Sequence, residues 1–196
     1  RRTARARRAT ARTGHDEVRA CYDLTVVDTL VRILGPDDEP AFRAFLAPRA
    51  SSSMFMLSNS SAAGFVDEGK RLQATYAGAF ADGRLVGVAA HGWNGMLLVQ
   101  APAELTTPET VGELVRHAVA ASGRAISGFS GTADQVQVAR RAFTLPPATL
   151  DEVEGLYTLE LEHLRVPVAL ATTAVACRAP RVEELPLVAQ WRRAYH

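Results

Sequence analysis

The sequence is almost without lysine: Lys70 is its one lysine among 22 basic residues. This usage, together with abundant alanine, indicates a GC-rich coding sequence, so arginine runs are weak evidence for a nucleic-acid site. Cysteine is also scarce. Cys21 and Cys177 lie far apart, and two cysteines make neither a disulfide framework nor a zinc site, so we expect a reducing, cytoplasmic compartment. No run approaches the roughly 18 apolar residues of a membrane helix, so no membrane partner is expected.

The charge is distributed unevenly. Residues 1–19 hold seven arginines against Asp16 and Glu17, a net +5, whereas the whole chain is +1, which leaves about −4 for the rest. We interpret residues 1–23 as a basic leader without a fold of its own. An organelle-targeting segment remains an alternative because it would share this composition. A nucleic-acid arm is a weaker one, because no aromatic residue interleaves the arginines of residues 1–14.

The first third of the chain predicts a strand and two helices. A β-branched run predicts a strand over 24–34, which Gly35-Pro36 ends. Pro36 then begins a helix whose inner side is formed by Phe42, Phe45 and Leu46. The hydroxyls of Ser51, Ser52 and Ser53 are expected to cap a second helix, with Met54, Phe55 and Leu57 as its apolar side and Gly64 at its end.

The middle of the chain predicts an antiparallel meander. Strands are expected over 74–80, 84–91 and 96–100, joined by turns that contain Asp82-Gly83 and Asn94-Gly95. Such dipeptides supply the positive φ angles that tight hairpins need.

Helices and short strands are predicted to alternate after the meander. Thr107-Pro108 begins a helix that ends at Ser122-Gly123, and a strand over 125–129 and a helix over 132–143 follow. Alternating side chains predict a strand over 155–161, then a connector, a strand over 175–178 and a helix over 181–196. The order indicates a mixed α/β (α+β) fold with a mostly antiparallel central sheet flanked by helices.

Several of these segments together resemble the GNAT superfamily of acyl-CoA-dependent N-acetyltransferases, and in particular bacterial proteins with two tandem GNAT-like halves. The resemblance rests on residues 37–46, 52–59, 76–102, 128–136 and 155–167, while 177–191 resembles the start of a second half. It implies a GNAT-like domain over 24–165, and a linker with the first strand and helix of a truncated second GNAT domain over 166–196. The implied activity of the complete protein is transfer of an acetyl group from acetyl-CoA to a small-molecule or peptide amine.

The resemblance also implies where the cofactor binds. In that superfamily the sheet splays beside the fourth strand, and a glycine-containing loop supplies backbone N–H groups to the pyrophosphate. Here residues 101–108 contain no glycine and two prolines, which have no N–H. We therefore expect a degenerate half without activity of its own, and we assign no catalytic residue. The alternative is a non-catalytic ligand-binding or self-association module, which would form homo-oligomers.

Four residues are candidates for a phosphate or other anion site, because they follow a strand and open a helix: Gly128, Ser130, Gly131 and Thr132. We favour a simpler interpretation, a turn in which Ser130 or Thr132 caps the helix. His91, Trp93 and Asn94 at a hairpin tip are candidates for ligand contact, although we favour a turn with Trp93 folded over apolar surface.

The remaining candidates have simpler structural interpretations. Tyr76 and Tyr157 could serve as a general acid, but we expect both to pack within strands. Glu104 could act as a base, but we expect an exposed loop carboxylate. Glu113 and His117 are expected to pair on a helix surface. His15, His163 and His196 have no evident partner, and no cluster of ligand residues has the spacing of a metal site.

Overall fold

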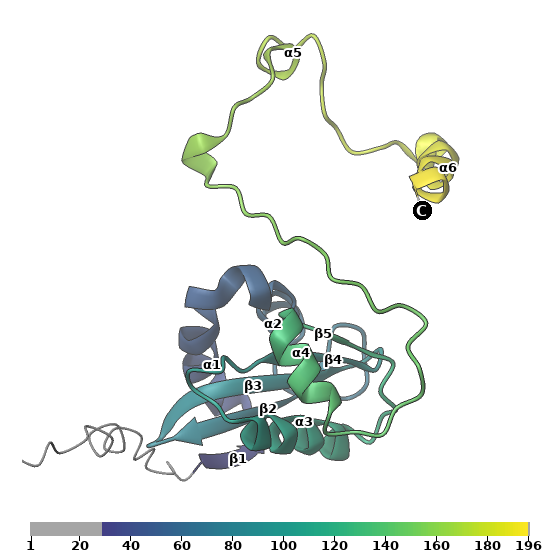
Figure 1. The fold of residues 1–196 in the computed structure, drawn as a ribbon. Helices are drawn as coiled ribbons and strands as arrows, with labels where there is room; N and C mark the ends of the chain where they lie inside the picture. Colours follow the sequence, from purple (N-terminus) through teal and green to yellow (C-terminus); the bar gives the residue numbers. More distant parts are fainter. Residues whose placement is uncertain (1–28, 196) are drawn as a thin grey trace, which may run out of the picture. The chain divides into compact units, whose positions relative to one another are not determined.

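The computed structural model describes residues 29–195. The predicted leader over 1–23, which contains His15 and Cys21, lies outside the described residues, as do residues 24–28 of the first predicted strand and His196. Contacts divide the chain after Glu154 into two units, which are described separately below (Figure 1).

The first unit is built on one five-stranded sheet. Its strands are Thr29–Ile33 (β1), Ala74–Ala81 (β2), Arg84–Gly92 (β3), Met96–Gln100 (β4) and Gly128–Ser130 (β5). They lie in the order β1-β2-β3-β4-β5, and only β4 and β5 run parallel. The expected mixed α/β fold with a mostly antiparallel sheet is therefore confirmed.

The meander β2–β3–β4 follows the predicted turns. Asp82 and Gly83 have φ angles of 49° and 73°, and Gly95 has φ of 79°. Aspartate is one of the few residues that tolerate this region, and glycine adopts it without steric conflict. Gly95 is also required for space, because a Cβ there would lie 2.7 Å from the carbonyl oxygen of Ala125.

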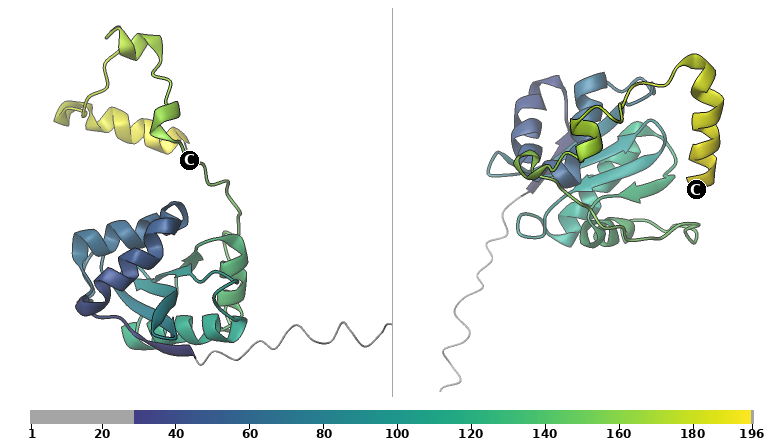
Figure 2. Two further views of the ribbon diagram at one scale, coloured as in Figure 1. Left: turned by 90° about the vertical axis from the view of Figure 1, so that its left-hand side faces the viewer. Right: turned by 90° about the horizontal axis from the view of Figure 1, so that it is seen from above.

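Helices cover both faces of this sheet (Figure 2). Helices Glu39–Leu46 (α1) and Ala50–Ala63 (α2) pack on one face, where Phe42, Phe45 and Leu46 are buried as predicted. Helices Pro108–Ser122 (α3) and Ala133–Arg140 (α4) pack on the other. As predicted, Thr107 caps α3 by accepting a hydrogen bond from the N–H of Thr110, 3.2 Å away, and Gly123 ends it with φ of 66°.

The predicted apolar side of α2 is confirmed at Leu57 alone, which packs half-buried against the core. Met54 and Phe55 are 44% and 59% exposed, and the buried residues are Ser53, Met56 and Ser60. Successive helical residues are rotated by about 100°, so a consecutive apolar run spreads around the helix and only part of it can face the sheet.

Over residues 155–195, which the structure describes, the second unit contains helices but no strand. Its α-helices are Val168–Ala171 (α5) and Leu185–Tyr195 (α6), with short 3-10 turns at Leu161–His163 and Val182–Glu184. The predicted strands over 155–161 and 175–178 are wrong, whereas the predicted final helix is confirmed over its described part. No side chain described in this unit is buried. None of the helices described in either unit is long and apolar enough to cross a membrane.

Candidate functional site: the opening between β4 and β5

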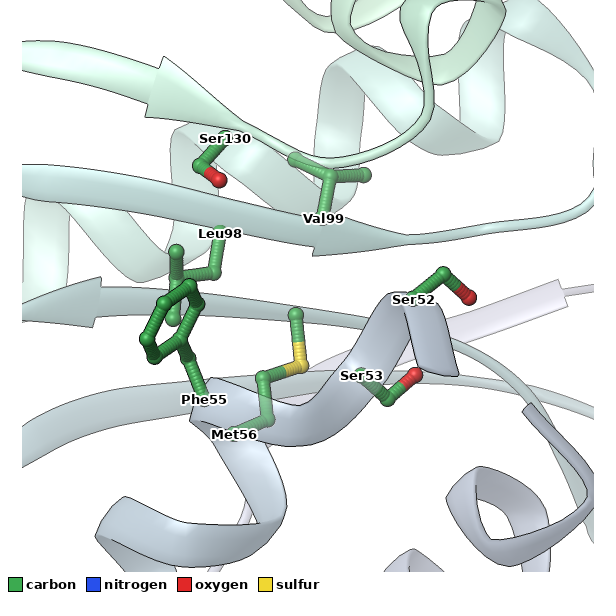
Figure 3. A pocket seen from close by; sticks show the side chains of 7 residues that line it. All are labelled: Ser52, Ser53, Phe55, Met56, Leu98, Val99 and Ser130. Carbon is green, nitrogen blue, oxygen red and sulfur yellow. The ribbon is translucent and has the colours of Figure 1, made fainter. Parts of the chain in front are cut away.

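The two parallel strands of the sheet part before β4 ends. The last paired residues are Leu98 of β4 and Ser130 of β5, and β4 continues through Gln100. Figure 3 shows Val99 and Ser130 beside this point, with α2 facing them. The opening therefore lies at the carboxyl ends of two parallel strands, where α/β sheets commonly bind ligands.

The chain that follows β5 closes one side of the opening. A Cβ at Gly131 would lie 2.8 Å from the carbonyl oxygen of Val99, so only glycine permits this approach. Next, the side-chain oxygen Oε1 of Gln135 accepts a hydrogen bond from the N–H of Ala101 at 2.7 Å. Both Ala101 and Gln135 are buried. The backbone from Val99 to Ala101 is thus in contact with the β5–α4 turn and hydrogen-bonded to α4.

A second polar cluster joins α2 to the end of β4. The hydroxyls of Ser52 and Ser53 donate to Oε1 of Gln100 at 2.8 and 3.0 Å. The predicted capping role of Ser51, Ser52 and Ser53 is wrong, because the helix begins at Ala50 with Arg49 as its N-cap and has no side-chain cap. The hydroxyls of Ser52 and Ser53 instead provide hydrogen-bond partners for the buried side chain of Gln100, at the interface between α2 and the sheet.

A small pocket lies against this cluster (Figure 3). It measures about 200 Å³, its open mouth included, and is lined by Ser52, Ser53, Phe55, Met56, Leu98, Val99 and Ser130. None of these side chains is ionisable, so none of them can act as a general base or acid. Because this volume includes open solvent, the enclosed space falls far below the roughly 300–1,000 Å³ of typical ligand sites. The enclosed part of this space has room for about one water molecule, so the pocket is a shallow recess and supplies no proton chemistry.

The predicted anion-site residues Gly128, Ser130, Gly131 and Thr132 lie at this same opening. Thr132 is the N-cap of α4 in position, but its hydroxyl makes no capping bond. The first turn already contains a carboxylate, Asp134, whose pKa is lowered by the Thr132 hydroxyl and by the N–H groups of Gln135 and of Asp134 itself. An external anion would therefore meet a resident negative charge at this helix start.

The loop between β4 and α3 is bonded within itself. The N–H groups of Leu105 and Thr106 donate to the carbonyl of Pro102, and the Thr106 hydroxyl lies 3.0 Å from the same oxygen. Glu104 is exposed, as expected for a loop carboxylate.

His91, Trp93 and Asn94, which were predicted to lie together at a hairpin tip, differ in burial. His91 is fully buried near the end of β3, where Nδ1 lies 2.6 Å from the hydroxyl of Ser122 and Nε2 lies 3.2 Å from the carbonyl oxygen of Gly95. Burial lowers the pKa of His91, although the hydrogen bond to Gly95 opposes the shift. Asn94 and Trp93 are exposed in the turn. His91 is therefore a core residue and cannot contact a ligand at the surface.

The sequence did not reveal a partly buried ion pair next to His91. Asp67 accepts two bonds from the Arg124 guanidinium and one from the Thr75 hydroxyl at 2.6 Å, and Arg124 also donates to the His91 carbonyl at 2.8 Å. Burial alone would raise the pKa of Asp67, but the bonds from Arg124, Thr75 and the N–H of Gly69 outweigh burial and lower the pKa to about 2. These residues are up to 57 positions apart, and no local pattern marks such a pairing. The group ties the 64–73 segment to the chain that follows the end of α3.

The two tyrosines that were candidates for a general acid, Tyr76 and Tyr157, differ in burial. Tyr76 is 1% exposed, as strand packing predicts, and burial followed by the charge of Asp67 raises its pKa to about 12. Such a group holds its proton too tightly to be a good acid near neutral pH. Tyr157 is 92% exposed, so its predicted strand packing is wrong.

The surroundings of two further histidines, His117 and His163, also differ from what the sequence predicted. His117 bonds the backbone carbonyl of Glu113 at 3.1 Å rather than its carboxylate, so the expected side-chain pair is wrong. His163 lies 3.8 Å from Glu162 at the surface. Within residues 29–195, no group of three or more His, Cys, Asp or Glu side chains could hold a metal ion.

Comparison with protein-family models and with curated proteins found no match. Among solved structures, the chain is similar to a ribosomal-protein-alanine N-acetyltransferase from Brucella melitensis biovar Abortus 2308. The alignment covers 65% of this chain and 99% of that one, with 16% sequence identity and a TM-score of 0.41. A likeness at this level identifies neither a family nor an activity.

Proposed function

We propose that the chain is part of a GNAT-type N-acetyltransferase that uses acetyl-CoA and an amine acceptor, and that residues 29–154 form a half that does not carry out the transfer. The strand order supports the first part, because an antiparallel meander is followed by one parallel strand that separates from it near the end of β4. In this proposal the pyrophosphate loop belongs to the second half, which residues 166–196 are predicted to begin.

One observation supports the second part of the proposal. The opening between β4 and β5 is bridged from within the chain, by the bond from the Ala101 N–H to Gln135. The neighbouring start of α3 is capped by its own Thr107 and has Pro108 in its first turn. These groups leave an incoming coenzyme few free donors for its pyrophosphate.

Calorimetric titration of the whole chain with acetyl-CoA tests the proposal. We expect no saturable binding up to about 1 mM, which corresponds to a binding free energy weaker than about −4 kcal/mol. We also expect no coenzyme A release in the presence of amine acceptors. An acetyltransferase of known coenzyme affinity, titrated in the same buffer, is the positive control. Micromolar binding of acetyl-CoA to this chain would overturn the assignment of a non-catalytic half.

A further inference from the structure

We propose that the outer face of α2 is a homodimer interface, on which the same face of a second copy of this chain packs about a two-fold axis. The proposal is independent of the proposed function, because it concerns the outer side of a helix and needs neither a coenzyme nor an acceptor.

The absence of charge distinguishes α2 from the other long helix of the first unit. The two helices have similar lengths, 14 residues for α2 and 15 for α3. A helix that faces water on one side typically places charged residues there, and α3 does so with Glu109, Glu113 and Arg116. The exposed residues of α2 follow the same helical spacing, but all of them are uncharged: Ala50, Ser51, Met54, Phe55, Ser58, Ser61 and Ala62. The composition of α2 is therefore that of a helix packed on two sides.

Two large apolar side chains lie near the centre of this face. Met54 and Phe55 are both exposed, and Phe55 also lines the shallow recess beside Leu98 (Figure 3). No side chain that lines the recess is charged, so the uncharged surface continues from α2 onto the sheet. Adjoining exposed apolar side chains without a charge between them are typical of the core of an interface, where charged residues are depleted.

The charge and the side-chain sizes of this face favour a second copy as its occupant. A two-fold interface places a surface against itself, so a charge near the axis meets a like charge. The α2 face has no charge to repel its own copy. An axis through the midpoint of α2 brings Phe55 against Ser58 of the partner subunit. A large side chain then faces a small one, which lets two helices pack closely.

The size of the face sets the expected affinity. A helix of 14 residues is about 21 Å long. Two helices of this length bury less than the roughly 1,200 Å² at which stable interfaces begin. We therefore expect a transient dimer with a dissociation constant on the order of 10–100 μM.

Sedimentation equilibrium of the whole chain tests the proposal. The mass should rise from that of a monomer to that of a dimer between about 5 and 500 μM. Phe55→Lys should raise the dissociation constant at least about tenfold, because it buries like charges near the axis. Leu30→Lys on β1 and Trp191→Lys on α6 are the matched controls. Their side chains are 63% and 64% exposed, and neither substitution should weaken the dimer.

An exchange of side-chain sizes tests the two-fold pairing. Ser58→Phe alone places two rings against each other and should weaken the dimer. Phe55→Ser combined with Ser58→Phe again places a large residue opposite a small one, so this double variant should dimerise like the unmodified chain.

Several outcomes would overturn the proposal. A chain that stays monomeric up to about 500 μM would refute it. So would a dimer that Phe55→Lys does not weaken while its near-ultraviolet circular dichroism is unchanged. Loss of the dimer in Trp191→Lys would assign the association to α6 instead, and a monomeric double variant would refute the two-fold pairing. Should Phe55→Lys fail to fold, Met54→Lys is read by the same criteria.

Discussion

The two units of this chain form ordered structure by different means. Residues 29–154 bury two apolar clusters against the faces of one sheet, whereas residues 155–195 bury no described side chain although leucine, valine and aromatic residues recur throughout them. The second unit nevertheless forms the helix α6. A helix satisfies its backbone groups within its own segment, whereas a strand needs a partner strand for its hydrogen bonds.

Two alternating segments make the difference explicit. The segment that forms β2 pairs with β1 on one side and β3 on the other. The segment 155–161 alternates in a similar way, but it is exposed and pairs with no strand within the described residues. Alternation therefore predicts strand propensity, and the partner decides whether a strand forms. The predictions below test how far the first unit depends on contacts that are distant in sequence.

The largest effect is expected from Arg124→Ala. The substitution leaves the carboxylate of Asp67, whose side chain is 12% exposed, without its main partner. Breaking a fully buried pair in this way costs about 3–5 kcal/mol, and because this pair is partly exposed we expect a loss of between about 2 and 3 kcal/mol. Urea unfolding should show this loss when it is followed by Trp93 fluorescence in a Trp191→Phe background, which leaves one tryptophan to report.

A matched surface pair provides the control for Arg124→Ala. Lys70 and Glu68 also form an ion pair, but their side chains are 72% and 54% exposed. Lys70→Ala should leave the free energy of unfolding nearly unchanged, because an exposed ion pair gains little in water. Equal effects of the two substitutions would show that the Asp67–Arg124 pair does not hold the 64–73 segment in place.

Acid should destabilise the first unit in two steps. Asp67 has its pKa lowered from 3.8 to about 2, so its contribution is complete above pH 4 and is lost as the pH falls towards 2. The full shift corresponds to about 2 kcal/mol. The pKa of His91 is lowered from 6.5, so below pH 6.5 the unfolded chain takes up a proton more readily and stability begins to fall. Urea midpoints measured between pH 7 and 2 should show both steps.

Variants assign each step to its residue. Asp67→Asn should remove the step below pH 4, and His91→Gln should remove the step that begins near pH 6.5. If the pH profile of Asp67→Asn matched that of the unmodified chain, the acid sensitivity would have another origin.

A substitution at Tyr76 is expected to stabilise the first unit rather than to destabilise it. Its hydroxyl is buried and has no hydrogen-bond partner among the described residues, while its ring packs at 5.2 Å from Phe42 and 5.0 Å from Phe65. Tyr76→Phe keeps the ring contacts and removes the unsatisfied polar group, so it should stabilise the first unit by about 1 kcal/mol. A loss of stability in urea unfolding would show that the hydroxyl has a partner.

Much of the fold could be predicted from the sequence because its signals are local. The turns at Asp82-Gly83 and Asn94-Gly95 and the cap at Thr107 each depend on a few neighbouring residues, and all three are confirmed. The strands over 155–161 and 175–178 were predicted wrongly, because pairing is not a local property.

The candidate site was less predictable than the fold. Residues 128–132 indicated its position, since a strand followed by a glycine-containing turn is a local pattern. Its two key bonds, from Ala101 to Gln135 and from Ser53 to Gln100, span 34 and 47 positions. A glutamine within a helix is unremarkable in sequence, and only the tertiary structure shows which N–H its oxygen meets.

The smallest effect on stability is expected from substitutions of Tyr157. These substitutions test the comparison between the two units most directly. Tyr157 is 92% exposed, so Tyr157→Ala should change the unfolding of the first unit by no more than about 0.5 kcal/mol. Tyr157→Phe, the matched control for Tyr76→Phe, should have no measurable effect on the same Trp93 signal. If Tyr157→Ala instead destabilised the first unit by several kcal/mol, the Tyr157 side chain would be packed in solution rather than exposed.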